Sequence, residues 1–326
     1  MPPVQPVQDE AGSNQSVTRP FEDADMKETR LLLGMSAMEP LQVANFQAYT
    51  HPLIIALWVA LSSAFVQVAG FWPKPEYGWY GYLAPIPAIA AMGYPILFVI
   101  DWIQRWNFEK ALRRLLLSED ILDIKSYYDK PSLFRVLIWN GRPIGYVALD
   151  AAYPDEVLTN LVDEEEKLGS TSSTDPKPTP AREKAAEILK ERNAQRKKRK
   201  NNDPATHAVI RHLYVDSVYH RSGIQHELVR RAVNEVFGHT SPKQQKSSTV
   251  QEVFVRISSL EKEKAKVLHE AGFVPTKDRK VDVGSEPVST RAPLWGLGLT
   301  LTGRALVGEK IEWWVLTRER WNKIAS

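Results

Sequence analysis

Cysteine is absent from all 326 residues of this chain. Its absence excludes disulfides, thiolate nucleophiles and zinc sites built on cysteine ligands. A charge imbalance is also lacking, because 42 Lys and Arg stand against 39 Asp and Glu and give a formal net charge of +3. Such a small net charge gives no argument for bulk nucleic-acid binding, so no nucleic-acid partner is expected.

Familiar catalytic motifs are missing as well. The sequence has no G-x-S-x-G turn, no H-E-x-x-H helix and no Walker loop. Its seven histidines show no metal-ligand spacing, so no metal is expected. No basic segment followed by an early apolar core is found near residue 1, which argues against a cleaved signal peptide.

Two long runs without charge are the most prominent feature that is present. They cover residues 52–72, "PLIIALWVALSSAFVQVAGFW", and residues 79–100. Each has the roughly 20 residues needed to cross the hydrocarbon core of a bilayer, and Trp and Tyr gather at their ends as they do at membrane interfaces. We therefore predict an N-terminal transmembrane helical hairpin within residues 51–104. The alternative is a buried helical hairpin in the core of a soluble domain.

Two spans leave both ends of the chain on one side of the membrane. Arg105, Lys110, Arg113 and Arg114 follow the second span, whereas the loop between the spans has only Lys74. The positive-inside rule then places the C-terminal part in the cytosol. Membrane lipid is accordingly an expected partner.

Two segments lack the pattern of packed elements. Residues 1–50 hold seven acidic and three basic side chains and are predicted to be an acidic, disordered tail. Residues 155–205 combine acidic, Ser/Pro-rich and basic blocks and are predicted to be a charged, disordered insertion. This insertion ends on "RKKRK" (Arg196–Lys200), which we interpret as an exposed basic loop beside lipid headgroups rather than a nuclear signal.

The remaining residues alternate between strand and helix patterns. Asn140-Gly141 joins two apolar runs within residues 133–150, which predicts a β-hairpin. The expected elements that follow are a strand in "HAVIRHLYVDS", a turn at Gly223, a helix ended by Gly238, a strand over 250–257, a helix closing at Gly272 and a last strand over 309–321. The order predicts a mixed α/β domain within residues 105–326.

This order of elements and three sequence stretches resemble the GNAT superfamily of N-acetyltransferases. The stretches are "GRPIGYVALD", "LYVDSVYHRSGIQHELVRRAV" and "VLHEAGF", and the resemblance covers about residues 115–150 and 205–321. With the apolar hairpin, the chain is similar to the camello-like membrane-bound N-acetyltransferases. The resemblance implies a GNAT-like α+β mixed sheet, acetyl-CoA as cofactor, and an amine acceptor that is a protein lysine or a small amino compound. It also implies the endoplasmic reticulum or another endomembrane.

In this family the pyrophosphate of the cofactor lies on a strand-loop-helix turn, where backbone N–H groups and the helix dipole attract anions. Of the small residues typical of that turn, only Gly223 matches outright. Gln225 stands where Gly or Ala allows close packing, so its side chain must rotate outward or narrow the space. The cofactor-binding residues implied are Tyr214, Val215, His220, Arg221, Ser222, Gly223, Ile224, Gln225 and His226. An ordinary turn that has lost acetyl-CoA is the alternative.

Acetyl transfer to an amine requires a base, a hydrogen bond to the carbonyl oxygen and an acid for the thiolate. His212 and Asp216 are the candidate bases, although His212 equally fits a partly buried, hydrogen-bonded histidine. Leu268 occupies the place of the family's tyrosine acid, and the neighbouring His269 is its candidate substitute. Catalysis by positioning alone, with water carrying protons, also stays open.

We therefore predict a membrane-anchored, acetyl-CoA-dependent N-acetyltransferase. A non-catalytic, membrane-tethered adaptor with the same fold is the alternative, because the cofactor turn is eroded and the tyrosine is missing. A soluble nuclear acetyltransferase directed by "RKKRK" is a third possibility.

Overall fold

The computed structural model describes residues 16–72, 75–152, 158–168, 180–238, 248–277 and 308–325. Within these residues, seven strands form one mixed sheet in the order β1-β2-β3-β4-β5-β7-β6. Neighbouring strands are antiparallel except β4 and β5, which run parallel. The strands are β1 (Val17–Pro20), β2 (Leu133–Trp139), β3 (Arg142–Ala152), β4 (His207–Val215), β5 (Glu252–Ser258), β6 (Val274–Thr276) and β7 (Ile311–Thr317).

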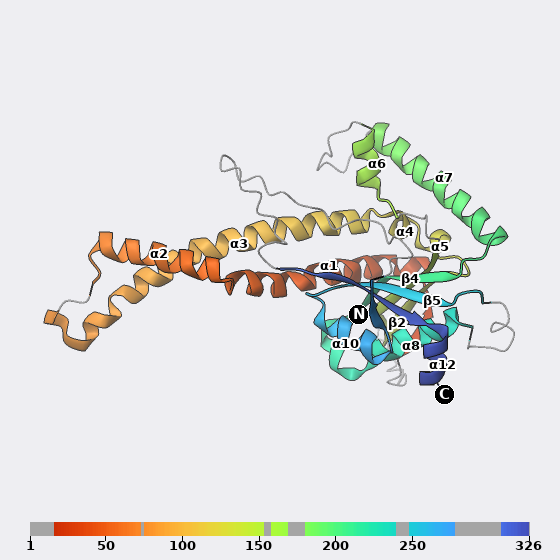
Figure 1. The fold of residues 1–326 in the computed structure, drawn as a ribbon. Coiled ribbons are helices and arrows are strands. Elements are labelled where there is room, and N and C mark those ends of the chain that lie inside the picture. Colours follow the sequence, from red (N-terminus) through yellow and green to blue (C-terminus); the bar gives the residue numbers. More distant parts are fainter. Residues whose placement is uncertain are drawn as a thin grey trace, which may run out of the picture.

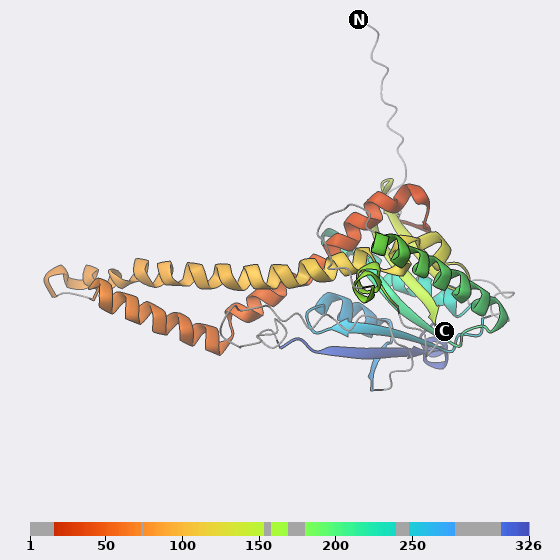
Figure 2. The same cartoon turned by 90° about the horizontal axis from the view of Figure 1, so that it is seen from above.

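Helices cover both faces of the sheet, and a long helical arm extends away from it (Figures 1 and 2). The α-helices are α1 (Met26–Tyr49), α2 (Pro52–Ala69), α3 (Pro85–Leu116), α4 (Glu119–Leu122), α5 (Ile124–Tyr127), α6 (Leu161–Lys167), α7 (Pro180–Asn202), α8 (Ile224–Val236), α10 (Lys262–Glu270) and α12 (Arg318–Ala325). Short 3-10 helices are η1 (Asp23–Asp25), η2 (Pro75–Leu83) and η3 (Ser217–Ser222).

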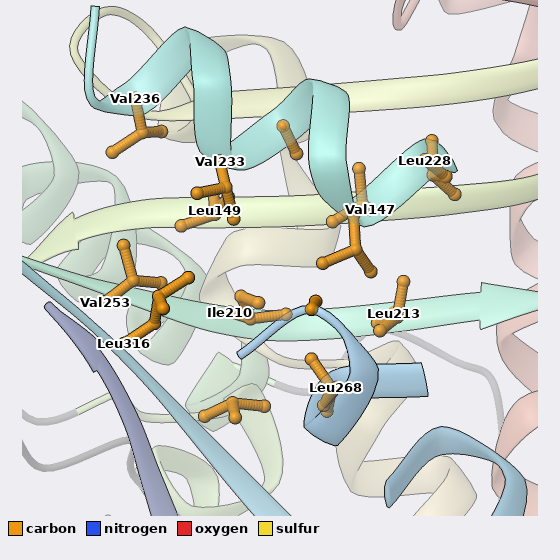
Figure 3. Close-up of a cluster of buried hydrophobic side chains, with 14 of the residues drawn as sticks. Val147, Leu149, Ile210, Leu213, Leu228, Val233, Val236, Val253, Leu268 and Leu316 are labelled. Carbon is orange, nitrogen blue, oxygen red and sulfur yellow. The ribbon is translucent and has the colours of Figure 1, made fainter. Parts of the chain in front are cut away.

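Two hydrophobic cores lie on opposite faces of the sheet. One core packs α8, α10 and α12 against the strands, and Figure 3 shows it between α8 and the sheet with Val147, Leu149, Ile210, Val233 and Val253. The other core packs α1, α4 and α5 against β2, β3 and β4 and contains stacked aromatic rings, among them Phe134 and Tyr146. This arrangement is the mixed α/β fold predicted from the sequence.

Local signals predicted several turns correctly. Asn140 and Gly141 both have positive φ, 47° and 74°, as a two-residue hairpin turn requires. Gly238 follows α8 with φ 80°, and Gly272 follows α10 with φ 93°. Phe273 then returns to the core and is fully buried.

The last strand is shorter than predicted. β7 ends at Thr317, and α12 follows it directly. The guanidinium of Arg318 donates to the backbone carbonyl of Phe237 at 2.5 Å, and the indole N–H of Trp321 donates to Asn234 at 2.9 Å. These bonds tie the new helix to the C-terminal end of α8, so tertiary contacts decide the change from strand to helix.

The N-terminal segment also differs from the expected disordered tail. Residues 17–20 pair with β2, where Val17 lies opposite Ile138, and α1 buries Leu32 and Leu33 in the second core. The buried residues of α1 include Thr29 and two alanines besides its leucines, so α1 lacks the clear apolar stripe that would have predicted it. Residues 1–15 lie outside the described part of the chain.

The predicted insertion contains helices α6 and α7, and "RKKRK" belongs to α7 rather than to an exposed loop. Its first residue, Arg196, has only 9% of its side chain exposed. The guanidinium forms an ion pair with Asp150 and lies 3.7 Å from the ring centroid of Tyr127. A buried carboxylate on β3 thus accounts for the position of this arginine, because buried charges require partners. Residues 155–157 and 169–179 of the insertion are outside the described part.

A second arginine meets the same carboxylate from β4. Arg211 has a fully buried side chain, and its Nε donates to Oδ2 of Asp150 at 2.7 Å. Ser132 donates to Oδ1 at 2.8 Å, and Tyr127 contributes a longer bond of 3.3 Å to Oδ2. Asp150 is therefore the centre of a buried polar network that links β3, β4, α5 and α7.

Arg211 also marks a bulge in β4. Ala148 of β3 pairs with His212, but the next residue, Leu149, pairs with Ile210, so Arg211 is the extra residue. The pairing of β4 with β5 covers only His207–Ile210 and ends at the same place. A bulge bends its strand, and after it β4 and β5 separate.

The helical arm consists of α2 and the N-terminal part of α3, which extend beyond the sheet in both views (Figures 1 and 2). Two helices in the described residues, within Pro52–Ala69 and Gly78–Leu116, are long and apolar enough to cross a membrane, but only 11% and 17% of their most apolar windows are buried. The Trp58 indole donates to the Ile89 carbonyl at 2.9 Å, and a Cβ at Gly93 would meet the same ring at 3.0 Å. The two helices thus pack on each other and expose their other faces.

We expect Asp150→Ala to lower the free energy of unfolding by about 3–5 kcal/mol, because two buried arginines lose their carboxylate. Urea unfolding of the full chain in detergent, followed by circular dichroism, measures this change. The control is Arg231→Ala, which removes an exposed pair with Glu227 and should change the free energy by no more than about 0.5 kcal/mol. Equal effects of the two variants would contradict the role assigned to the network.

Candidate functional site

The candidate site lies where β4 ends and α8 begins. β4 and β5 have separated by this point, so the edge of β4 that faces β5 has no strand partner beyond Ile210 among the described residues. Figure 3 shows the first turn of α8, marked by Leu228, close to the C-terminal half of β4, marked by Leu213. The unpaired end of β4 therefore leads to the N-terminus of a helix.

The turn that connects η3 to α8 is built around Gly223. This residue has φ 75°, and a Cβ placed on it would meet no atom within 4 Å. Ser222 donates to the carbonyl of Tyr219 at 2.6 Å, and its hydroxyl accepts the N–H of Ile224 at 3.4 Å. The N–H groups of Gly223 and Gln225 have no acceptor within the described part of the chain. Free N–H groups at a helix N-terminus attract anions.

Gln225 does not rotate outward to solvent. The residue is 4% exposed, and its Oε1 has no hydrogen-bond partner among the described residues. The residue belongs to the buried stripe of α8 with Leu228 and Val229, one turn closer to the start of the helix. A buried, unpaired amide oxygen costs about 1–3 kcal/mol, so a donor from a ligand would be stabilising at this position. His226 has an unpaired, buried Nδ1 beside it.

Of the other predicted cofactor residues, Arg221 and Ser222 are exposed, and Ile224 packs partly against the core. Tyr214 and Val215 are buried at the end of β4. The packing there is tight, because a Cβ on Gly145 of β3 would lie 2.8 Å from the Tyr214 carbonyl. Gly145 therefore allows β3 to approach β4 closely beside the site.

His220 faces α1 rather than the free N–H groups of α8. Its Nε2 lies 2.7 Å from the backbone carbonyl of Val215, and its Nδ1 lies 3.9 Å from Oε1 of Glu39. A carbonyl only accepts hydrogen bonds, so Nε2 carries a proton. The predicted contact of His220 with a phosphate is not what this geometry favours.

Glu39 was missed by the sequence interpretation. It belongs to α1, in the segment expected to be disordered, and 42% of its side chain is exposed. Burial raises the pKa of the Tyr214 hydroxyl, and the negative charges of Glu39 and Asp216 raise it further. Two carboxylates therefore act on the Tyr214 hydroxyl at the end of β4. No local sequence pattern predicts that Glu39 lies near the end of β4, because only a tertiary contact between α1 and β4 brings it there.

Asp216 lies at the turn itself. Its carboxylate accepts the N–H of Val218 at 3.2 Å, which caps η3, and its own N–H donates to Ile144 at 2.8 Å. Its position at the end of β4 agrees with the strand end expected from the sequence. Its role as a base stays a prediction.

His212 lies on the α4 side of the sheet, because the bulge at Arg211 shifts the alternation of β4. Its Nε2 lies 2.5 Å from Oδ2 of the fully buried Asp120, which also accepts from the Tyr128 hydroxyl at 2.7 Å. Burial raises the pKa of Asp120, but the charge and hydrogen bond of His212, with help from Arg211, lower it to about 2. This geometry is that of a hydrogen-bonded core histidine.

His269 lies on α10, apart from both His212 and Asp216. It is exposed on α10, and its ring meets the edge of Trp314 at 6.2 Å between centroids. Leu268 beside it is fully buried in the core. Within the described residues, no contact joins His269 to His212 or Asp216, so the three predicted catalytic residues do not form one cluster.

Comparisons with known proteins give a fold-level similarity. No protein-family model and no curated protein sequence matches the chain. Among solved structures, spermidine N-acetyltransferase from Vibrio cholerae in complex with CoA and spermine is 9% identical, with a TM-score of 0.35, and covers 95% of this chain and 99% of that one.

Two further structures show the same low similarity. An agmatine N-acetyltransferase is 14% identical, with a TM-score of 0.34, covering 93% of this chain and 99% of that one. A GNAT-family acetyltransferase from Streptococcus pneumoniae is 8% identical, with a TM-score of 0.29, covering 61% and 73%.

The Asp120–His212 contact predicts a pH dependence of stability. The carboxylate pKa is about 2 in the folded chain, against about 3.9 in an unfolded one. A carboxylate whose pKa is lower in the folded state stabilises the folded chain, and this contribution is fully present above the pKa of the unfolded state. The contribution is lost as the pH falls through the pKa of the folded state. Compared with Asp120→Asn, the parent should gain about 2–3 kcal/mol above roughly pH 4 and lose that gain toward pH 2.

Denaturant unfolding at a series of pH values measures this difference. Glu263→Gln, on the exposed side of α10, serves as the control that removes one carboxylate outside the network. A difference between parent and Asp120→Asn that stays constant from neutral pH down to pH 2 would show that the carboxylate is not held by His212.

Proposed function

We propose that this protein is a membrane-anchored, acetyl-CoA-dependent N-acetyltransferase of the GNAT type. The observation that carries the proposal is the part of the β4 edge beyond Ile210, which has no β5 partner among the described residues and leads to unpaired N–H groups at the start of α8. The N–H groups suit an anion, and the unpaired strand edge suits an extended amide chain. Acetyl-CoA combines these two chemistries with an acetyl thioester, which it supplies to the reaction when bound.

The residues present fit such a ligand at three places. The N–H groups of Gly223 and Gln225 would hold the pyrophosphate, because they lack acceptors and lie at the positive end of the α8 dipole. The unpaired edge of β4 beyond Ile210 can hydrogen-bond an extended chain with amide groups, as an added strand does. The free Oε1 of Gln225 can accept an amide N–H.

The α1 side of the same strand end suits the acceptor. Glu39 and Asp216 place negative charge around Tyr214, and opposite charge attracts the ammonium form of an amine. This supports an amine acceptor, whether a lysine of a protein or a small amino compound. His212 is engaged with Asp120, so we do not assign it to proton transfer.

Acetyl-CoA binding can be tested with a matched pair of variants. Gly223 and Gly141 have φ of 75° and 74°, and both face open space, so Asp at either position brings the same strain and charge. We expect Gly223→Asp to weaken acetyl-CoA binding at least about tenfold because the charge repels phosphate, whereas Gly141→Asp should stay within about twofold. Isothermal titration calorimetry of the full chain in detergent measures both.

The same titration separates the enzyme from a non-catalytic adaptor. The buried side chain of Gln225 would favour an adaptor if it fills the space that the cofactor needs. An adaptor predicts no binding by the parent chain even at millimolar acetyl-CoA. Equal weakening by both variants would mean that the Gly223 turn does not hold the phosphates.

The anchor in this proposal is the arm formed by α2 and α3. A helix in the core of a soluble domain is mostly buried, whereas these helices expose most of their apolar windows. Exposed apolar surface of this extent marks a membrane or partner surface, and the length of each helix fits a bilayer. Both ends of the arm return to the α/β part, which the positive-inside rule places in the cytosol, at the endoplasmic reticulum or another endomembrane.

We expect Leu61→Arg, in the middle of α2, to oppose insertion by about 2.5–3.5 kcal/mol and to lower the membrane-bound fraction. Ile324→Arg on α12 is the control, because Leu61 and Ile324 have similar exposure, 44% and 49%, but only Leu61 lies in the arm. Alkaline extraction of membranes measures the bound fraction. Release of the parent chain by salt alone would contradict a spanning arm.

A further inference from the structure

We propose that Glu39 and His220 form the pair that binds the ammonium group of the acceptor and removes its proton. The inference rests on the proposed acetyl transfer and adds the residues that prepare the amine. It joins a residue of α1, which leads into the arm, to a residue of η3 beside the Gly223 turn.

The orientation of the His220 ring is fixed by the backbone. Its Nε2 donates to the Val215 carbonyl at 2.7 Å, and its side chain is 15% exposed. With the proton on Nε2, the neutral ring presents the lone pair of Nδ1 toward α1. The edge of the ring also meets the Tyr214 ring, with 6.4 Å between centroids, which limits its rotation.

The acceptor atoms of the pair are separated by a distance that suits one shared donor. Nδ1 of His220 and Oε1 of Glu39 are 3.9 Å apart, too far for a direct hydrogen bond. The Glu39 carboxylate already has a side-chain hydrogen bond with the Tyr214 hydroxyl, and a donor between the carboxylate and Nδ1 of His220 would pair the acceptor capacity that remains. One ammonium nitrogen can reach both at about 2.9 Å, the usual length of such a bond.

The proton transfer follows from this arrangement. The N–H bond of the ammonium breaks, and a new N–H bond forms at Nδ1 of His220. The amine keeps its electron pair and becomes neutral, and His220 becomes an imidazolium. The carboxylate of Glu39 balances that charge, as an acidic residue does beside a catalytic histidine.

The other polar groups near Glu39 and His220 also favour a cationic ligand. Asp216 at the end of β4 adds a second negative charge near Tyr214, and the Tyr214 hydroxyl, whose pKa is raised, stays protonated. Tyr146 on β3 is neutral as well, because burial raises its pKa, and it donates to Ser36 of α1 at 2.9 Å. The surroundings therefore favour an ammonium ligand over an anion.

The first test is spectroscopic and requires no acetyl-CoA. Long-range 15N–1H NMR of the histidine rings in the full chain should show the His220 proton on Nε2 and an unprotonated Nδ1 when no amine is present. Adding propylammonium should shift its Nδ1 signal, and the shift should vanish in Glu39→Gln. A ring that is already cationic without amine, or a shift unchanged in Glu39→Gln, would overturn the proposal.

The second test is a double-mutant cycle on the acetylation of propylamine and of a lysine peptide. Glu39→Gln keeps the size of the side chain, and His220→Gln keeps a donor for Val215 but removes the acceptor nitrogen. We expect each to lower kcat/KM by about 10²–10³-fold, and the double variant to lose little more, because the pair acts as a unit. Acetyl-CoA affinity should stay within about twofold of the parent.

Glu28→Gln is the matched control, an exposed glutamate near the start of α1, and it should keep the rate of the parent. Additive losses in the cycle, or a Glu39→Gln rate within about threefold of the parent, would refute the pair. A parent chain that binds acetyl-CoA but acetylates neither probe would refute it too. Failure of the parent to bind acetyl-CoA would instead contradict the proposed function.

Discussion

The buried ion pair between Arg211 and Asp150 is the interaction on which the rest of the molecule depends. It holds the bulge of β4 against β3, and beyond that bulge β4 no longer pairs with β5. The same carboxylate binds Arg196 and so fixes α7 to the sheet. Removing two opposite charges from water is costly unless they are well paired, so the chain retains this arrangement only as a complete network.

Separation of the two strands divides the candidate site by charge. The α8 side offers unpaired N–H groups at Gly223 and Gln225, while the α1 side offers the carboxylates of Glu39 and Asp216. The end of β4 lies between them and belongs to both cores through Val215 and Tyr214. In the proposed reaction, the anionic donor would bind on one side of this strand end and the cationic acceptor on the other.

Local sequence signals predicted the parts that local chemistry controls. Asn140-Gly141, Gly223 and Gly238 each specify a backbone conformation within a few residues, so the hairpin, the turn and the end of α8 were correct. Glu39, Arg196 and Asp120 were not recognised, because each acquires its role from a partner far along the chain. Asp120, for example, is 92 residues from His212. Long-range contacts of this kind override propensity and leave no periodic signal.

Helix α1 has a consequence for the choice of acceptor. It runs from the sheet to Tyr49, just before α2, with Pro40 inside it, and a helix rises 1.5 Å per residue. With the arm in a bilayer, Glu39 would stand about 15 Å above the place where the chain enters it. In that arrangement the helix would act as a spacer, and the height of an amine above the lipid surface would limit its access to Glu39.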